Sequence, residues 1–348
     1  MPAADVSRVR RVLVFSTTAI GDTLMNTPAI RALRKALPAA RITAVVDRRR
    51  ADLLRHNPHV DHLIVYPGKF RRILSLVREL RAVRPDWAIV LHGNDPDIPL
   101  LAYLSGARGR AGWRESRMSF LFTYTPKTDP SLPFVRKRLA LLEGLGVFPD
   151  GERTDLYLPP PEGGPAERLG LFDHDWSSGV VAIHPFGSRR SKWWPAESVR
   201  SLVDRLWREM GLRSVILGGE KERAEAETLA EGAEAGPVIA CGKTSLLETA
   251  VLLRRSRALV TTDSGPMHLG FALGVPTVAL FGPEDFRDYG VGGDEERIAF
   301  LMGETSCARP CKKKTCDIEG HPCMASIGVE MVLEAVRDRI ASPAVVPE

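Results

Sequence analysis

Short apolar runs alternate with segments of helical periodicity along most of the chain. Residues 11–15 and 41–46 are two such runs, and residues 22–37 between them place Ile30 and Leu33 at helical spacing. This order predicts a strand, a helix and a second strand, the pattern of a βαβ unit in a parallel sheet. The first half continues with a predicted strand at residues 62–66, a helix at 70–83 and a further strand at 87–91. A less regular stretch follows at residues 95–133.

A second series of elements is predicted after a segment rich in proline and glycine, residues 150–178. Its strands are expected at residues 180–184, 214–217, 238–240, 258–261 and 277–281. Its helices are expected at residues 195–209, 222–235, 246–254 and 266–273, with a closing helix at 329–340. We therefore predict an α/β protein with two Rossmann-like domains, residues 1–160 and 161–328. Residues 329–348 would form a helix and tail that pack back across the cleft.

The chain has 348 residues, of which 44% are hydrophobic and 26% charged. This is ordinary globular composition at about twice the usual length of one domain. No apolar run approaches the roughly 18 residues of a membrane-spanning helix, and the N-terminus leads into a charged segment rather than a secretion signal. These features predict a cytoplasmic protein.

The net charge of +5 is unevenly divided along the chain. Residues 1–165 carry 26 Lys and Arg against 16 Asp and Glu, a net of +10, whereas residues 166–348 carry 22 against 27, a net of −5. The basic half indicates either an anionic partner or simply a solvated basic face. Nucleic acid is not expected, because no basic stripe interleaved with aromatic residues and no known binding motif occurs.

Ligands of open parallel sheets bind at the carboxyl ends of the strands, so the loops after the predicted strands are the places to search. The first loop, residues 16–23, is small and hydroxylated. It contains only Gly21 where a dinucleotide fingerprint needs three glycines. Asp22 follows at the start of a predicted helix. It is either a carboxylate favoured by the helix dipole or a general base that faces the cleft.

Two loops of the second half are suited to phosphate groups. Residues 185–195 form a cationic loop with Arg189, Arg190 and Lys192, which could neutralise a departing diphosphate or form a solvated basic turn. Residues 261–268 follow a predicted strand and open a helix, where Ser264 and Gly265 would let an anion approach the backbone N–H groups. Helix capping alone is the alternative explanation for this second loop.

Three segments in this order resemble glycosyltransferase family nine, the heptosyltransferases of lipopolysaccharide core assembly. They are IGDTLMNTPAIRALRKALP at 20–38, SKWWPAE at 191–197 and TDSGPMHLGFALGVPTVALFGP at 262–283. The resemblance implies a GT-B fold and an ADP-heptose donor bound mainly by the C-terminal domain. It also implies an inverting transfer that needs no metal or other cofactor. The acceptor would be a glycolipid at the cytoplasmic membrane face, where the protein could be peripheral.

Carried over by position, Asp22 would deprotonate the acceptor hydroxyl and Lys192 would stabilise the diphosphate leaving group. Glu220 would lie near the nucleoside ribose, although Glu222 is an alternative alignment. The donor-binding set is Ser188, Lys192, Glu220, Asp263, Ser264, Gly265, Pro266, Met267 and His268. The acceptor-side set is Thr18, Gly21, Arg48, Arg49 and Arg50.

Four of the five cysteines, hereafter the cysteine cluster, have the spacing C-x3-C-x4-C-x6-C at Cys307, Cys311, Cys316 and Cys323. The spacing allows one tetrahedral Zn or Fe site, although it lacks the paired C-x2-C units of common zinc motifs. The resemblance extends to autotransporter heptosyltransferases that hold iron through four cysteines at another spacing. Free thiols and disulfides are the alternatives.

Two other functions fit the same fold. One is a catalytically silent protein that binds a nucleotide sugar, against which the joint presence of Asp22 and Lys192 argues. The other is an epimerase or transferase that uses a different nucleotide sugar. Incubation with the donor alone would reveal an epimerase.

Overall fold

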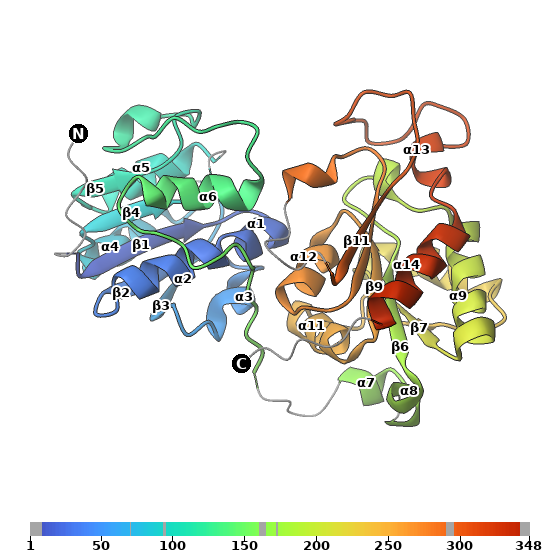
Figure 1. Cartoon of the computed structure of the whole chain (residues 1–348). Helices are drawn as coiled ribbons and strands as arrows, with labels where there is room; N and C mark the ends of the chain where they lie inside the picture. The colour runs from blue at the N-terminus through green and yellow to red at the C-terminus, as the bar shows by residue number, and fades with distance from the viewer. Residues whose placement is uncertain are drawn as a thin grey trace. The chain divides into compact units, whose positions relative to one another are not determined.

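The computed structural model of the chain describes residues 9–69, 71–92, 95–159, 165–171, 173–289 and 296–341. The chain divides into two compact units (Figure 1). Unit 1 comprises Met1–Tyr157 and Asp288–Gly292, and unit 2 comprises Leu158–Arg287 and Gly293–Glu348. Each unit is built around one parallel sheet, which confirms the predicted α/β fold class.

The sheet of unit 1 has the strand order β3-β2-β1-β4-β5, and all of its pairs are parallel. Its strands are β1 (Arg11–Ser16), β2 (Arg41–Asp47), β3 (His62–Tyr66), β4 (Trp87–Val90) and β5 (Gly109–Ala111). The central strand β1 is buried on both faces, and for this reason its sequence is an uninterrupted apolar run.

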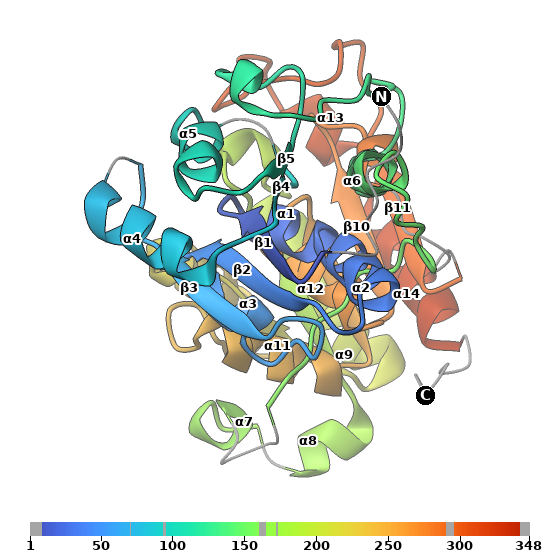
Figure 2. The same ribbon diagram turned by 90° about the vertical axis from the view of Figure 1, so that its left-hand side faces the viewer.

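Helices cover both faces of this sheet (Figure 2). They are α1 (Ile20–Met25), α2 (Thr27–Ala36), α3 (Ala51–Arg55), α4 (Ile73–Val83), α5 (Asp97–Leu104) and α6 (Phe134–Glu143). Side chains alternate between the two faces of a strand. Val12 and Val14 therefore join the core under α2 and α6, whereas Leu13 and Phe15 join the core under α4 and α5.

The prediction of one helix over residues 22–37 was wrong in detail, because the segment folds as α1 and α2 with Asn26 between them. Pro28 is the second residue of α2, and in the first turn its missing N–H removes no intrahelical hydrogen bond. The Asn26 side chain donates to Ser16 Oγ at 2.8 Å and accepts from Arg138 Nε at 2.6 Å. The break is therefore fixed by contacts that come from two other elements.

The stretch 95–133 also contains more regular structure than the sequence predicted. Helix α5 and strand β5 lie within it, together with the short 3₁₀ helix η2 (Ser119–Leu121). Helix α5 is apolar almost throughout and contains Pro99, so it shows no amphipathic periodicity. It is helical because it is buried against the sheet.

The sheet of unit 2 has the strand order β11-β10-β9-β6-β7-β8 and is again parallel. Its strands are β6 (Val180–His184), β7 (Arg213–Ile216), β8 (Val238–Ile239), β9 (Ala258–Thr262), β10 (Thr277–Phe281) and β11 (Ile298–Met302). The edge strand β11 was missed at the sequence level. Its apolar run, residues 298–302, is as long as those of β6 and β10, and it pairs in parallel with β10.

The helices of unit 2 lie on both sides of its sheet (Figure 1). They are α7 (Pro165–Arg168), α8 (Asp173–Ser178), α9 (Ala196–Met210), α10 (Arg223–Glu231), α11 (Leu246–Arg255), α12 (Gly265–Ala272), α13 (Pro322–Ala325) and α14 (Val329–Ala341), with 3₁₀ helices η3 (Arg190–Lys192), η4 (Glu220–Glu222) and η5 (Phe286–Asp288). Helix α14 packs against α9 and strands β9 to β11, and its Val332 and Val336 are buried in that core. Its apolar face is thus taken up within unit 2.

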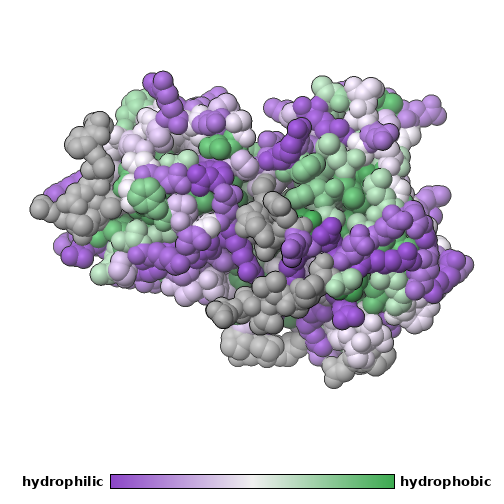
Figure 3. Space-filling view, in the orientation of Figure 1, coloured by the Kyte–Doolittle hydropathy of each residue, from purple (hydrophilic) through white to green (hydrophobic). Residues whose placement is uncertain are grey.

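Hydrophilic residues are spread over both units in the view of Figure 3, with patches of hydrophobic residues between them. The most exposed large hydrophobic side chains are Leu74, Phe120 and Phe148, which lie far apart in the sequence. Among the described residues, no helix combines the length and the apolar character that crossing a membrane requires.

Candidate functional site

The loops that follow β1 and β4 meet at the carboxyl edge of the sheet of unit 1, because these two strands are neighbours. The backbone N–H of Thr17 donates to His92 Nε2 at 2.9 Å, and the Thr17 hydroxyl lies 3.1 Å from the same nitrogen. Burial lowers the pKa of His92 to about 4, against the opposing effect of the nearby Asp22 carboxylate. The ring is therefore neutral at neutral pH.

Asp22 lies in the first turn of α1 and is held by a buried arginine of α6. Arg138 Nη2 donates to Asp22 Oδ1 at 2.7 Å, and the side chains are 6% and 34% exposed respectively. The same guanidinium donates to Asn26 Oδ1 and, at 2.8 Å, to the carbonyl of Phe134. Asp22 is thus a carboxylate oriented from one side and accessible from the other.

Neither Arg138 nor His92 was predicted from the sequence. Nothing in the segment FVRKRLALLE distinguishes Arg138 from Arg136, which is half-buried and pairs with Glu143 instead. His92 follows a predicted strand, and this position was the one available signal.

A cavity of about 400 Å³ opens beside Asp22 within unit 1. Its walls come from the end of β4, the segment 113–130 and helix α6. They include the imidazole of His92, the indole of Trp113, the ring of Phe134 and the Lys137 side chain. The arrangement could hold a polar ligand of small-molecule size next to a carboxylate.

The predicted acceptor-side residues separate into three groups in the structure. Gly21 is buried within α1, while Thr18 is half-buried, and its hydroxyl finds no hydrogen-bond partner among the described residues. Arg49 and Arg50 both pair with Asp47 Oδ1, at 3.2 and 2.6 Å. Arg48 and Arg49 are both exposed, and Arg48, which forms no ion pair with a described residue, lines a separate and larger groove.

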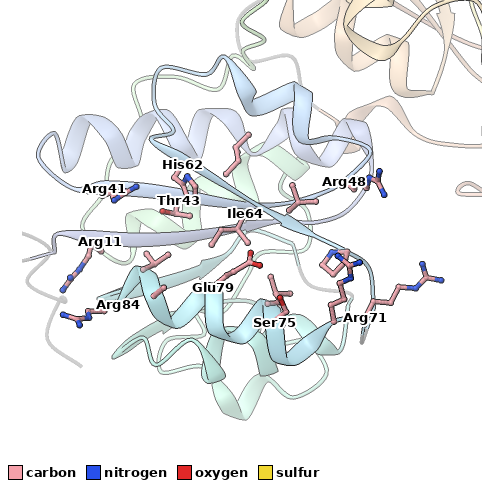
Figure 4. A pocket seen from close by; sticks show the side chains of 17 residues that line it. Arg11, Arg41, Thr43, Arg48, His62, Ile64, Arg71, Ser75, Glu79 and Arg84 are labelled. Atoms are coloured by element: carbon pink, nitrogen blue, oxygen red, sulfur yellow. The ribbon is translucent and has the colours of Figure 1, made fainter.

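This groove, hereafter the basic groove, has a volume of about 1550 Å³ (Figure 4). Six arginines line it, and none of them forms an ion pair with a described residue: Arg11, Arg41, Arg48, Arg71, Arg72 and Arg84. Arg11, Arg41 and Arg84 gather at one end, while Arg48 and Arg71 lie at the other. Glu79 also lines the groove, so the six arginines place part of the N-terminal excess of positive charge there.

The groove lies where helices leave part of one face of the sheet uncovered. Among the described helices, α4 and α5 cover the face of the five-stranded sheet that carries Leu13 and Phe15, and Phe122 packs on the same face. On this face Arg11, Arg41 and His62 lie at the amino ends of β1, β2 and β3. The helices do not cover these ends, so the three side chains line the groove. The sequence is polar there because the strands are not buried against a helix.

In unit 2, Lys192 ends the 3₁₀ helix η3 and is buried between two carboxylates. Its Nζ lies 2.5 Å from Asp263 Oδ2 and 3.4 Å from Glu284 Oε1. Arg189 forms an ion pair with Glu284 as well. The structure therefore brings the predicted lysine and aspartate together, and it adds Glu284, which follows the motif segment and was not predicted.

The predicted anion site lies at the start of α12, where Ser264 is the N-cap residue, Gly265 the first helical residue and Pro266 the second. Ser264 makes no capping hydrogen bond, and its hydroxyl contacts His184 Nδ1 at 3.0 Å and Thr261 Oγ1 at 3.2 Å instead. The first N–H groups of a helix lack intrahelical partners, so this end is suited to an anion.

The neighbouring candidates differ in exposure. Met267 and His268 are buried in the first turn of α12, whereas Ser188 is exposed in the loop before η3. Burial lowers the pKa of His184, beneath this helix start, to about 4. His184 is therefore neutral and adds no charge to the site at neutral pH.

Glu220 and Glu222, the two alternatives for the ribose contact, occupy different environments. Glu222 Oε2 accepts from the backbone N–H of Gly219 at 2.9 Å and so caps the turn. The Glu220 side chain is 71% exposed and lies against Gly242, where a Cβ atom would come within 2.0 Å of Glu220 Oε2. Glu220 is thus the carboxylate that a ligand could reach.

The cysteine cluster lines one cavity of about 400 Å³. Within the described part of the chain, however, no three His, Cys, Asp or Glu side chains are arranged to hold a metal ion. The side chains as they are placed do not fit the predicted Zn or Fe site. Burial raises the pKa of the fifth cysteine, Cys241, to about 12.

The segment that carries the cysteine cluster supports the loop of Lys192. Ser191 Oγ donates to the carbonyl of Lys313 at 2.6 Å, and Arg189 Nη1 donates to the carbonyl of Cys311 at 2.8 Å. His321 Nε2 donates to the carbonyl of Ser191 at 2.9 Å. These bonds fix the backbone on both sides of Arg190.

Comparisons with known proteins show the family to which the chain belongs. Lipopolysaccharide heptosyltransferase 2 of Escherichia coli K12 is 28% identical over 78% of this chain and 83% of its own length. Lipopolysaccharide heptosyltransferase 3 of the same strain is 26% identical over 76% and 80%. The crystal structure of a family 9 glycosyl transferase from Veillonella parvula is 26% identical, covers 98% of both chains and has a TM-score of 0.81. The family model for glycosyltransferase family 9 (heptosyltransferase) matches residues 73–321, more than half of the chain, and the chain belongs to this family.

Proposed function

We propose that the protein transfers heptose from ADP-heptose to an inner-core acceptor of lipopolysaccharide, with inversion at the sugar carbon and without a catalytic metal. Membership of family 9 and the heptosyltransferase names of the similar proteins support this choice of donor and acceptor. The observation that carries the proposal is the Asp22 carboxylate, which a buried guanidinium orients while one side stays accessible.

In the proposed reaction, Asp22 removes the proton from the acceptor hydroxyl as that oxygen attacks the anomeric carbon. Arg138 orients the carboxylate by donating to Oδ1, and the Asp22 side chain is 34% exposed, so an acceptor hydroxyl can reach it. Thr18 and Gly21 would lie on the acceptor side of the same loop. The proton ends on Asp22, and the bond to the diphosphate breaks.

Unit 2 would bind the donor. The N–H groups at the start of α12 and the Lys192 ammonium would hold the diphosphate, and Lys192 would neutralise the charge that develops as it leaves. Glu220 would accept from the ribose. The other donor contacts would come from Ser188, Asp263, Ser264, Gly265, Pro266, Met267 and His268.

Lys192 is already neutralised by Asp263 when no ligand is bound. The diphosphate would therefore compete with Asp263 for the ammonium or share it. This competition would favour the more highly charged leaving group over the intact donor, which is the direction that assists transfer.

We also propose that Arg48, Arg71 and Arg72 of the basic groove attract the anionic part of the glycolipid acceptor at the cytoplasmic membrane face. Arg48 and Arg71 lie at one end of the groove. They follow the carboxyl ends of β2 and β3, the same edge of the sheet at which Asp22 follows β1. Arg49 and Arg50, paired with Asp47, would contribute less.

The deciding experiment compares Asp22→Asn with Asp52→Asn in single-turnover assays with ADP-heptose and a lipopolysaccharide acceptor. Asp52 is a matched control, because it also lies in the first turn of a helix and pairs with an arginine, Arg55. We expect Asp22→Asn to bind ADP normally and to lose transfer by about 10²–10⁴-fold. Asp52→Asn should transfer at the wild-type rate. Wild-type transfer by Asp22→Asn would remove the base assignment.

Incubation with the donor alone separates the alternatives. An epimerase would change the sugar without any acceptor, and a silent binding protein would retain ADP affinity without consuming the donor. A panel of nucleotide sugars with mass-spectrometric detection of products would establish the donor.

A further inference from the structure

Four of the residues that line the cavity beside Asp22 each carry a buried polar atom that finds no partner among the described residues. These atoms are His92 Nδ1, Trp113 Nε1, Ser116 Oγ and Thr128 Oγ1. About 90% or more of buried polar groups in proteins are hydrogen-bonded, so four unpartnered groups around one cavity are unusual. A ligand or ordered water has to complete them.

The hydrogen-bonding role of two of these atoms is fixed. His92 Nε2 accepts from the Thr17 N–H, so the neutral ring carries its proton on Nδ1. The indole nitrogen of Trp113 can only donate. His92 is buried, so its Nδ1–H is held in place by the fold rather than by solvent. The cavity therefore presents two obligate donors, together with two hydroxyls that can donate or accept.

The remaining walls of the cavity combine the charged side chains of Glu115, Lys137 and Arg138 with apolar side chains. Leu91, Pro130 and the ring of Phe134 offer apolar surface, and the volume of about 400 Å³ is in the range of small-molecule sites. Polar atoms at fixed positions beside apolar surface match a pyranose ring, which has oxygens around its edge and C–H groups on its faces. A lipid chain would leave the donors unpaired, and a bare phosphate would leave the apolar wall unused.

We propose that this cavity is a saccharide subsite, in which the His92 Nδ1–H and the Trp113 Nε1–H donate to oxygens of one sugar unit of the acceptor. Ser116 and Thr128 bind further hydroxyls of the same unit. The sugar then lies with one hydroxyl next to Asp22, which lines the same cavity. The consequence for transfer rests on the proposed function, whereas sugar binding itself does not.

Two substitutions of His92 separate its two nitrogens. The amide of glutamine reaches the position of Nε2, so His92→Gln can still accept from Thr17 but loses the donor at Nδ1. The amide of asparagine reaches the position of Nδ1, so His92→Asn keeps that donor and loses the bond to Thr17. We expect His92→Gln to raise the acceptor KM about three- to tenfold with the donor KM unchanged. His92→Asn should raise it less and lower the melting temperature more.

Trp113→Phe removes the indole N–H and keeps an aromatic ring, and Trp207→Phe is the matched control on the exposed surface of α9. We expect the acceptor KM to rise about three- to tenfold for Trp113→Phe and to stay at the wild-type value for Trp207→Phe. Wild-type acceptor KM values in both His92→Gln and Trp113→Phe would overturn the proposal. The cavity would then hold water rather than a sugar.

A binding experiment does not depend on catalysis. Saturation-transfer NMR with a neutral methyl hexopyranoside and with a carboxylated pyranoside should show contact in the wild type and its loss in the His92→Gln/Trp113→Phe double variant, with glycerol as a polyol control. Sugar contact without any transfer to an acceptor would contradict the proposed function alone. Transfer with sugar contact equal in wild type and double variant would contradict the subsite alone.

Discussion

Removal of the Lys192 ammonium should destabilise unit 2 as well as weaken nucleotide binding. The side chains of Lys192 and Asp263 are only 11% and 7% exposed and lie 2.5 Å apart, so Lys192→Met leaves a buried carboxylate without this counter-charge. Breaking a buried ion pair by removing one partner costs about 3–5 kcal/mol. Glu284 keeps its pairing with Arg189, and we therefore expect the lower end of this range.

Differential scanning calorimetry tests this expectation. For a domain of about 150–250 residues, each kcal/mol lowers the melting temperature by about 2–4 °C, so Lys192→Met should lose about 6–12 °C at a cost of about 3 kcal/mol. The double variant Lys192→Met/Asp263→Asn should recover much of this loss, because a neutral amide requires no counter-charge. ADP at about 100 times its Kd should stabilise the wild type by about 2.7 kcal/mol, and Lys192→Met less at the same concentration.

Two results would contradict this prediction. A melting temperature of Lys192→Met within about 1 °C of the wild type would show that the pair contributes nothing net to stability. Equal stabilisation of the wild type and Lys192→Met by ADP would show that the lysine does not meet the diphosphate. The first result would leave the role in the reaction open to the transfer assay, while the second would remove it.

Three further predictions follow from the charges and thiols. His92 and His184 have pKa values of about 4 in the folded state against 6.5 when exposed, so the unfolded chain binds more protons as pH falls from about 6.5 to about 4. Urea unfolding should show stability lost over this window, by up to about 3 kcal/mol for each histidine, and His184→Asn should reduce the loss. At pH 8 a thiol reagent should modify the cysteine cluster and spare Cys241 until the protein unfolds. A bound Zn or Fe would slow that reaction until a chelator is added, and elemental analysis without metal would exclude it. The acceptor KM should rise with salt concentration, and it should rise less in the double variant Arg48→Ser/Arg71→Ser. The same salt dependence in this variant and in the wild type would show that the basic groove does not attract the acceptor.

The alternation of strands and helices could be predicted from the sequence, because strands buried on both faces of a parallel sheet are continuous apolar runs such as residues 11–15. The three loops that carry the family resemblance could also be located from the sequence, since each lies directly after a predicted strand. Local patterns of this kind act over a few residues and are visible without tertiary structure. The one-helix prediction for 22–37 failed because Asn26 is held by Ser16 and Arg138, which no local pattern reveals.

Only the tertiary structure decided which side chains complete the candidate site. Arg138 lies 116 residues from Asp22 in the sequence, and His92 lies 75 residues from Thr17. Each pair meets because the sheet order places β4 beside β1 and because α6 packs over the same face as α2. A charge or a ring nitrogen gains its role from the partner that it meets in a buried place. These partners are far apart in the sequence and meet only in the folded chain, so a local sequence pattern cannot reveal them.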